Sequence, residues 1–402
     1  MRRTLWIVFT LVGCGDDAAK VPDGGGMPTP DSPTCQPQSA VGSFYRRTPN
    51  PRLVAGGHTF TDSKLDTSIA DPDLSWDGAT WHIYYGTDHG TYGGATVPLI
   101  REATSPDLAT WTPRETPTLG LPTDTNAWDA VTIEAPSVVF DAAAPADRRY
   151  MMFYAGTKSA TTAAFRAYSI GLAISADGIT FTRILSGDSP KGEAGLVLTG
   201  ADAYPAATSA RLSDPDVVLV GSTFHMWFSS QGCNGSTCTG TGIGHATSTD
   251  GLHWTIDAAP VPSLLRMSSD PNSGGGQPSA VYDDVHCKWE MWLANDSPAT
   301  ENDNQPTESA NMVGVWHATS TNAASWTISY TQVRDLVWDG TASGEHLGMR
   351  TGADVAIRSG GRYMVYTGYD DQNVPTGATL PTRTGTTSAV MTLDLATRDA
   401  PP

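Results

Sequence analysis

The sequence predicts an all-β fold, a five-bladed β-propeller of four-stranded antiparallel blades around a central axis. Three observations lead to this prediction: many turn-forming residues, no sustained helical period, and a unit that occurs five times. The 402 residues include 41 Gly, 28 Pro and 12 Trp, and no long segment repeats apolar residues with the helical period of about 3.6 positions. We therefore expect short strands that are joined by turns.

The most regular part of the repeated unit places an aromatic residue six positions after a serine and follows it with threonine. Its central residues, Asp-Gly or their equivalents, suit a tight hairpin turn, and the flanking residues suit two outer strands of one small sheet. Each segment is therefore expected to be a strand, a turn and a strand. The four copies are Ser105–Thr112, Ser175–Thr182, Ser248–Thr255 and Ser320–Thr327.

Two further strands are expected ahead of each hairpin, a short aromatic one and, before it, one with Pro near its start. The aromatic strands begin at Trp81, Tyr150, Phe224, Trp289 and Tyr363. The strand starts with Pro are Asp71-Pro72, Glu134-Ala135-Pro136, Asp214-Pro215 and Gln277-Pro278, with Ala353-Asp354 in the fifth copy. Units of this size cannot bury their faces alone, so they are expected to pack around a ring. We expect a strand from near Phe44 to Val54 to complete the last sheet.

The start of the chain predicts export. Residues 1–13 have a basic start and an apolar stretch too short to span a bilayer core of ~30 Å, and they end directly before Cys14. They resemble bacterial lipoprotein signals, which implies that Cys14 carries lipids and that the protein is exported and anchored in the outer membrane. Residues 14–40, rich in Gly, Pro and Asp, predict a flexible tether, and residues 41–402 the propeller.

The cysteines and the net charge limit the pairings and partners that we expect. Cys233 and Cys238 bracket a four-residue turn, so an oxidising compartment favours a local disulfide between them, whereas Cys35 and Cys287 either pair or stay free. A formal net charge of −18 disfavours nucleic acid and anionic membranes as partners of the body. We expect a monomer that contacts the membrane only through the Cys14 lipid anchor.

The acidic strand starts resemble those of the five-bladed propeller glycosidases, above all glycoside hydrolase family 43 and its relatives in families 32, 62, 68, 117 and 130. The resemblance covers about residues 65–395, and it implies a general base at Asp71, a carboxylate that tunes the acid at Asp214, and a general acid at Glu134. The family reads Asp, Asp, Glu through its first three blades, whereas this chain reads Asp, Glu, Asp. Shifting the ring by one blade would instead make Asp354 the base and Asp71 the tuning carboxylate.

The chemistry of these residue types supports the same prediction independently. Inner strands of a propeller converge on its axis, so acids at their starts are gathered in one funnel. Hydrolysis of a glycosidic bond needs one protonated carboxyl group and one ionised group, and crowding raises the pKa of at least one of them. We assign the acid role to Glu134. For Asp73 and Asp216 we favour a structural role, since Asp beside Pro is common turn chemistry.

Other candidate groups lie in loops or at repeated positions. Trp128 and Tyr92 are predicted platforms for a sugar ring, and His346 is a predicted substrate-binding residue. No Cys or His spacing suggests zinc, and no cofactor is required, although the resemblance admits a structural Ca²⁺ near the axis. His245 and His317 occupy equivalent repeat positions, which indicates a shared structural place.

The predicted function is therefore hydrolysis of plant- or microbe-derived glycans with arabinose-, xylose- or fructose-type linkages, by paired-carboxylate acid/base catalysis. The alternative is a non-catalytic surface propeller that binds a glycan or a protein partner, and the altered order of the carboxylates favours it. A sialidase-like enzyme is a third reading, because the Ser-x-Asp-Gly-x-x-Trp turns are similar to Asp boxes. These turns are one residue shorter before Gly, however.

Overall fold

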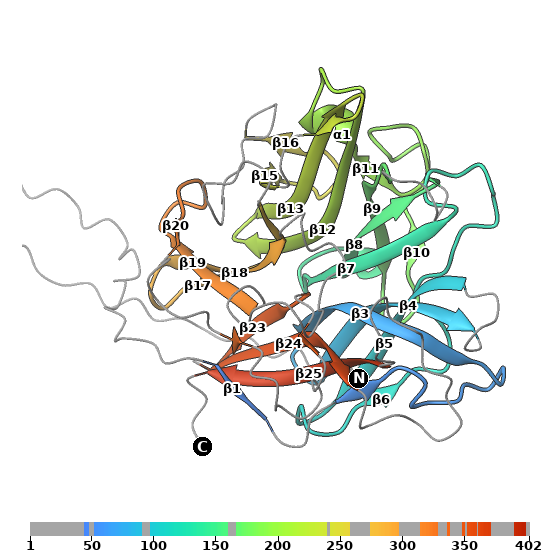
Figure 1. Cartoon of the computed structure of the whole chain (residues 1–402), viewed down its shortest axis with the longest axis vertical. Coiled ribbons are helices and arrows are strands. Elements are labelled where there is room, and N and C mark those ends of the chain that lie inside the picture. Colours follow the sequence, from blue (N-terminus) through green and yellow to red (C-terminus); the bar gives the residue numbers. More distant parts are fainter. Residues whose placement is uncertain are drawn as a thin grey trace, which may run out of the picture.

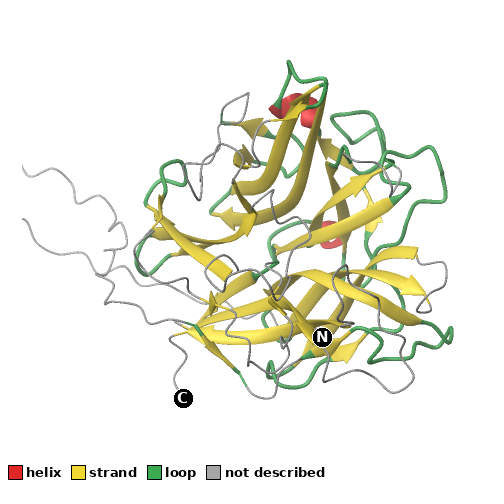
Figure 2. Ribbon diagram, in the orientation of Figure 1, coloured by secondary structure: helices red, strands yellow, loops and turns green. Residues whose placement is uncertain are grey.

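The protein is an all-β propeller of antiparallel sheets around an axis (Figures 1 and 2). The computed structural model describes residues 44–47, 52–90, 97–159, 166–238, 242–257, 274–296, 314–328, 336–337, 348–349, 352–359, 361–370 and 390–398. The predicted signal, Cys14, the tether, Cys35, Tyr92 and His346 lie outside these residues. No helix in the described ranges is long and apolar enough to cross a membrane.

The sheets follow one another around the centre in chain order (Figure 1). The first contains β3 (Leu65–Trp76), β4 (Trp81–Gly90), β5 (Val97–Ser105) and β6 (Thr112–Pro113). The second contains β7 (Thr132–Phe140), β8 (Tyr150–Thr157), β9 (Ser169–Ser175), β10 (Thr182–Arg183) and β11 (Leu196–Leu198). The third contains β12 (Ser209–Val220), β13 (Thr223–Asn234), β14 (Thr237–Cys238), β15 (Gly242–Ser248) and β16 (Thr255–Ile256).

Two more sheets complete the circle. One contains β17 (Gly274–Asp283), β18 (Lys288–Asp296), β19 (Gly314–Ser320), β20 (Thr327–Ile328) and β21 (Leu336–Val337). The other contains β22 (Gly348–Met349), β23 (Asp354–Arg358), β24 (Gly361–Asp370), β25 (Val390–Arg398), β1 (Tyr45–Arg46) and β2 (Leu53–Val54). The short helices are η1 (Ala146–Arg148) and α1 (Gly200–Ala203). Among the described residues the first sheet has the four strands that we predicted, and short additional strands extend the other four sheets.

The last sheet is built from both ends of the described chain. β25 pairs antiparallel with β1, where Tyr45 lies opposite Thr397, and with β2, where Leu53 lies opposite Leu393. The predicted pairing of early chain with late chain is therefore confirmed. The inner strands β3, β7, β12, β17 and β23 contact one another in sequence, and β23 also contacts β3.

The hydrophobic core lies between neighbouring sheets. One cluster joins Tyr84 and Ile100 of the first sheet to Met152 and Tyr154 of the second, and another joins Phe153 of the second to side chains of the third. Because each sheet buries side chains against both neighbours, its strands alternate little and their central residues are nearly all buried. This packing explains the aromatic second strands in the sequence.

The repeated Ser-x-Asp segments form the turns between the outer strands, as the sequence predicts. In the second sheet Ser175 Oγ donates to Asp177 at 2.9 Å, and Asp177 Oδ1 accepts from the backbone N–H of Ile179 at the same distance. Gly178, the fourth residue, has a φ of 72°. A left-handed conformation there favours glycine, which explains the Asp-Gly of two copies. Leu108 and Ala323 hold the same conformation in two others.

Gly178→Ala is expected to destabilise the protein by about 2–4 kcal/mol, because the left-handed φ and a collision both oppose the new methyl group. An added Cβ would lie 2.9 Å from Tyr150 Cε1 and 3.0 Å from the Tyr84 hydroxyl oxygen. Gly221→Ala is the matched control, since Gly221 has a φ of 63° and open space around it. Urea unfolding should give the control only the conformational loss of about 1 kcal/mol, and equal losses would contradict the collision.

Candidate functional site

The inner strands share a β-bulge at their Pro residues. In β3, β7, β12 and β17 the pairing register shifts across the residue before Pro and the Pro itself. The residue before Pro has a positive φ in each case: 50° for Asp71, 48° for Ala135, 49° for Asp214 and 47° for Gln277. Such a conformation costs about 1–2 kcal/mol outside glycine, less for Asp. Because Ala135 and Gln277 adopt the same conformation, the backbone strain is a feature of the propeller fold and not of the acids. The bulges differ only in the side chain that they place beside the axis.

These bulges surround an axial cavity that opens to solvent, with about 350 Å³ of empty space when the open solvent at its mouth is included. Two layers of side chains line it: the residues directly before the Pro positions, and the residues directly after them. The lining residues are Asp71, Pro72, Asp73, Ala135, Pro136, Ser137, Asp214, Pro215, Asp216, Gln277, Pro278, Gly352, Ala353 and Asp354. The predicted convergence of strand starts on one axial cavity is therefore observed for Asp71, Asp214 and Asp354.

The layer before Pro carries two half-buried acids, Asp71 and Asp214. Gln277 Nε2 donates to Asp71 Oδ1 at 3.2 Å, and Ser213 Oγ donates to Asp214 Oδ2 at 2.9 Å. A Cβ at Gly352 would lie 2.9 Å from Asp71 Oδ1, so only glycine leaves this carboxylate its room. Both acids are thus oriented by polar neighbours and face the cavity.

The layer after Pro forms a closed ring of hydrogen bonds around the axis. In each inner strand the side chain directly after the Pro position accepts a hydrogen bond from a backbone N–H of the next inner strand. Asp73 of β3, for example, accepts from Val138 of β7, the residue after Ser137. The bonds run from Val138 to Asp73 at 3.1 Å, Val217 to Ser137 at 3.0 Å, Ala280 to Asp216 at 2.6 Å, Val355 to Ser279 at 3.0 Å, and Leu74 to Asp354 at 2.6 Å. Since serine and aspartate make the same bond, this layer is structural.

The ring corrects the place that we predicted for Asp354. Counting back from the aromatic strand put it at the Asp71 position, but the structure puts Gly352 there and Asp354 level with Asp73. The fifth strand has no Pro, and its neighbour β24 pairs one residue out of the predicted register, with Val365 opposite Asp354. Both oxygens of Asp354 are hydrogen-bonded, to Leu74 N and to Ser279 Oγ at 2.8 Å. It is therefore a frame residue rather than the base.

The three ring carboxyl groups repel one another in a buried setting. Burial, then the charge of Asp354, raises the pKa of both Asp73 and Asp216 well above its usual range, and burial raises that of Asp354 to about 6. Asp73 Oδ2 is buried without a hydrogen-bond partner. The ring thus favours protonated carboxyl groups.

Asp354→Asn is expected to stabilise the protein above pH 6 and to have little effect at pH 4. The pKa of Asp354 is raised in the folded protein to about 6, so the folded state favours the neutral carboxyl group. The free energy of unfolding of the parent protein is therefore highest below about pH 4 and falls as the pH rises through about 6 and Asp354 ionises. Two pKa units correspond to at most about 3 kcal/mol. Thermal melts across this range test it, and a variant less stable than the parent at pH 7 would contradict it.

Glu134 lies one residue before the cavity-lining Ala135, directly ahead of the bulge in β7. Its side chain is half-buried and hydrogen-bonded to the Tyr168 hydroxyl. A Cβ at Gly86 of β4 would meet the Cα of Glu134 at 3.6 Å, an ordinary van der Waals distance, so β4 lies beside this part of β7. Glu134 itself is not among the residues that line the cavity.

Trp128 does not have the place that we predicted for a sugar platform. Its side chain is only 6% exposed, its Nε1 donates to the carbonyl of Ala194 at 3.0 Å, and its ring stacks on Tyr154 with 5.7 Å between centroids. The surrounding loop folds down on the second sheet, which a single sequence does not reveal. Trp128 is therefore a core residue, and Tyr92 and His346 lie outside the described residues.

Within the described part of the chain, no group of three or more His, Cys, Asp or Glu side chains is placed to hold a metal ion. The ring carboxyl groups of Asp73, Asp216 and Asp354 already accept backbone hydrogen bonds. Cys233 and Cys238 form a disulfide, and Cys287 is also disulfide-bonded.

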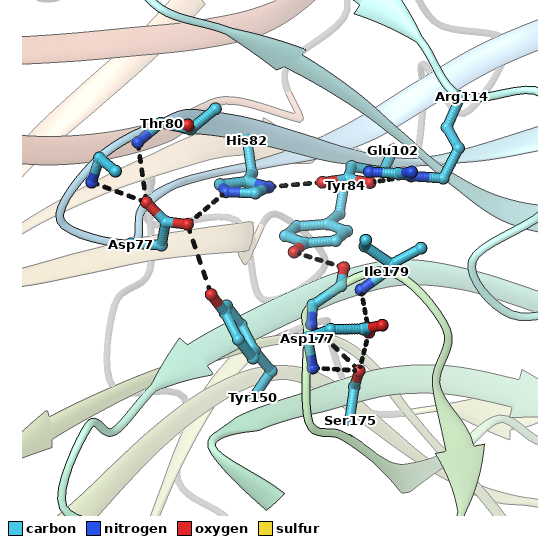
Figure 3. Close-up of polar contacts among 12 residues, drawn as sticks. Asp77, Thr80, His82, Tyr84, Glu102, Arg114, Tyr150, Ser175, Asp177 and Ile179 are labelled. Atoms are coloured by element: carbon cyan, nitrogen blue, oxygen red, sulfur yellow. Dashed lines mark hydrogen bonds and ion pairs between the residues drawn. The ribbon is translucent and has the colours of Figure 1, made fainter. Parts of the chain in front are cut away.

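A second concentration of charge is buried in the first sheet (Figure 3). His82 Nδ1 is hydrogen-bonded to Glu102 at 2.5 Å, and His82 Nε2 is ion-paired with Asp77 at 3.2 Å. Arg114 Nε donates to the other oxygen of Glu102 at 2.5 Å. Glu102 has no exposed surface. Burial alone lowers the pKa of His82, but Glu102 and then Asp77 outweigh it, so this pKa lies above its usual value.

The same three strand positions hold other side chains elsewhere. The second sheet has Met151, Leu172 and Ile184 there, and the third has His225, His245 and Asp257. His245 bonds to Asp257 at 2.7 Å, and burial and the charge of His245 lower the pKa of His225 to about 4. His245 and His317 do pair with equivalent residues, Trp227 and Trp292, so their predicted structural equivalence is confirmed. The charged network of the first sheet, the apolar side chains of the second and the His–Asp network of the third therefore occupy equivalent positions in their sheets.

No protein-family model and no curated protein matches the chain. Solved structures do match its fold. A chain described as a glycoside hydrolase is 14% identical with a TM-score of 0.60, over 90% of this chain and 93% of that one. A chain described with the GH130 family of mannoside phosphorylases, which contains glycoside hydrolases that target β-1,2-mannosidic linkages in Candida mannan, is 13% identical with a TM-score of 0.55, over 90% and 95%.

A family 32 β-fructofuranosidase from Bombyx mori is 14% identical with a TM-score of 0.52, over 85% of this chain and 62% of the insect chain. At these identities the likeness is one of fold. The chain therefore shares the propeller fold found among glycoside hydrolases.

Proposed function

We propose that the protein is a glycoside hydrolase whose active site is the axial cavity of a five-bladed propeller. The observation that carries the proposal is the presentation of Asp71 and Asp214 by two strained bulges on one cavity, with Glu134 beside it. The glycoside hydrolases that share this fold support the class of reaction. The five sheets and the ring of five inner-strand hydrogen bonds support the blade count.

Within this proposal Glu134 is the general acid, Asp71 the general base and Asp214 the carboxylate that orients the substrate. The base must be ionised to activate water, and Asp71 accepts the hydrogen bond that Gln277 donates, which suits that state. Paired carboxyl groups on opposite sides of a glycosidic bond are the minimum that its hydrolysis needs.

The substrates that we propose are plant- or microbe-derived glycans with arabinose-, xylose- or fructose-type linkages. A screen of the full-length protein should include aryl arabinosides, aryl xylosides, sucrose, fructans and β-1,2-mannosides. The fructosides and mannosides are included because one fold neighbour is described as a β-fructofuranosidase and another with β-1,2-mannosidic linkages. Turnover of one class that is lost in Glu134→Gln is the expected result. Equal turnover by that variant would remove Glu134 from the mechanism.

A non-catalytic propeller that binds a glycan or a protein is the second candidate. It is favoured by the cavity itself, since Asp73, Asp216 and Asp354 serve the frame and Glu134 is absent from the lining. Calorimetry that detects glycan binding without any turnover in the screen would support this candidate. We also propose export with a lipid anchor at Cys14 and a monomeric state.

A further inference from the structure

Glu134 is held by a polar cluster between the first and second sheets. Arg166 Nη1 donates to the Tyr168 hydroxyl oxygen at 3.2 Å, and that hydroxyl is hydrogen-bonded to Glu134. Tyr168 is only 7% exposed. It packs with Ala135, which lies in the bulge of β7, and with Ala155 of the partner strand β8. The backbone carbonyl of Tyr168 also accepts from Leu212 N at 3.0 Å, so the residue is fixed on several sides.

The direction of each hydrogen bond in this cluster follows from the donors available. A guanidinium group has only donors, so the Tyr168 oxygen accepts from Arg166. The single hydroxyl hydrogen is then left for Glu134, which accepts it on one carboxyl oxygen. Burial and the charge of Glu134 raise the pKa of Tyr168 far above its usual value, so the hydroxyl keeps this hydrogen.

Arg166 also has an acidic neighbour in the first sheet. Burial raises the pKa of the half-buried Asp88 in β4 above its usual value, and the hydrogen bond from Ser68 and the charge of Arg166 oppose this rise. Asp88 also accepts from Ser68 Oγ at 3.4 Å. Arg166 is therefore hydrogen-bonded to the Tyr168 hydroxyl oxygen and is near enough to Asp88 for their charges to interact.

We propose that Tyr168, fixed by Arg166, is a positioning residue that donates to one oxygen of the Glu134 carboxyl group and leaves the other oxygen to carry the catalytic proton. This inference rests on the proposed hydrolase function. A carboxyl group with one oxygen bonded to a donor can present its own proton only on the other oxygen. The same donor stabilises the carboxylate that forms when the proton passes to the leaving oxygen.

The test follows the titration of Glu134 directly. The chain has only eight glutamates, so isotope labelling of the glutamate carboxyl carbon gives few NMR signals, and Glu134→Gln identifies the relevant one by its loss. Tyr168→Phe keeps the ring and removes the donor, so the midpoint of the Glu134 signal should rise by about one pH unit. Arg166→Met should raise it as well. Tyr154→Phe removes another buried hydroxyl, bonded to Asp129 at 2.9 Å, and should leave it unchanged.

An unchanged Glu134 midpoint in both Tyr168→Phe and Arg166→Met would overturn the inference, whatever the activity. If the midpoint rises, the alkaline limb of the kcat/KM profile should move to higher pH by the same amount, because a general acid must be protonated. A shifted midpoint with an unmoved limb would also overturn it. A shifted midpoint in a protein that hydrolyses no glycoside would instead overturn the proposed function, and Tyr168 would then only hold the fold.

Discussion

Asp71→Asn is expected to lower kcat/KM for glycoside hydrolysis by about 100- to 10,000-fold, the range typical of a lost general base. The amide has nearly the same size and tolerates the left-handed conformation that Asp71 adopts, with a φ of 50°, so the bulge should persist. It cannot take a proton from water. Steady-state kinetics on the substrate class found by the screen measures the loss.

Asp216→Asn is the matched control for this prediction. Asp216 lines the same cavity, but its carboxyl group accepts from Ala280 N at 2.6 Å, and Ser137 makes the same bond with a neutral hydroxyl. Its replacement should leave kcat/KM within a few-fold of the parent value. Equal losses in the two variants would show that the cavity is sensitive to any change, and the assignment of Asp71 as base would fail.

Glu102→Leu is expected to destabilise the protein by about 3–5 kcal/mol, the usual effect of breaking a buried ion pair from one side. The substitution leaves His82 and Arg114 without the carboxylate that bonds to both at 2.5 Å. His82 then keeps only Asp77 as a charged partner in Figure 3. Urea unfolding monitored by tryptophan fluorescence gives the change in the free energy of unfolding.

The triple variant His82→Met, Glu102→Leu, Arg114→Ile should recover most of that stability, to within about 2 kcal/mol of the parent. It copies Met151, Leu172 and Ile184, the residues at the same positions in the second sheet. Buried ion pairs can often be replaced as a set by apolar groups of similar volume at little loss. A triple variant as unstable as Glu102→Leu would disprove the equivalence of these positions.

The repeat made the strands and the closure of the last sheet predictable, because hairpin turns and aromatic strands have recognisable spacings. The roles of individual acids were not predictable in the same way. A bulge shifts the register by a residue without leaving a mark in the pattern, and so Asp354 was placed at the position of Gly352. The equivalence of Asp73 with Ser137 appears only when both are seen to accept the same backbone hydrogen bond.

Contacts made by loops and between sheets were also not predictable from the sequence. Tyr168 lies 34 residues beyond Glu134, ahead of a strand, and nothing in its neighbourhood signals a polar contact. Glu102, a charged residue in β5, would be assigned to the surface by its type, yet it is fully buried because His82 and Arg114 neutralise it. Both cases depend on partners brought together by neighbouring strands and sheets, which a one-dimensional pattern cannot contain.

The pairing of β25 with β1 and β2 has a consequence for biosynthesis. Among the described residues β1 and β2 pair with β25 alone, so a growing chain cannot seal the circle until Val390–Arg398 has been made. Truncation before Val390 should therefore leave an open assembly with two unpaired edges, prone to aggregate, rather than a shorter but intact protein.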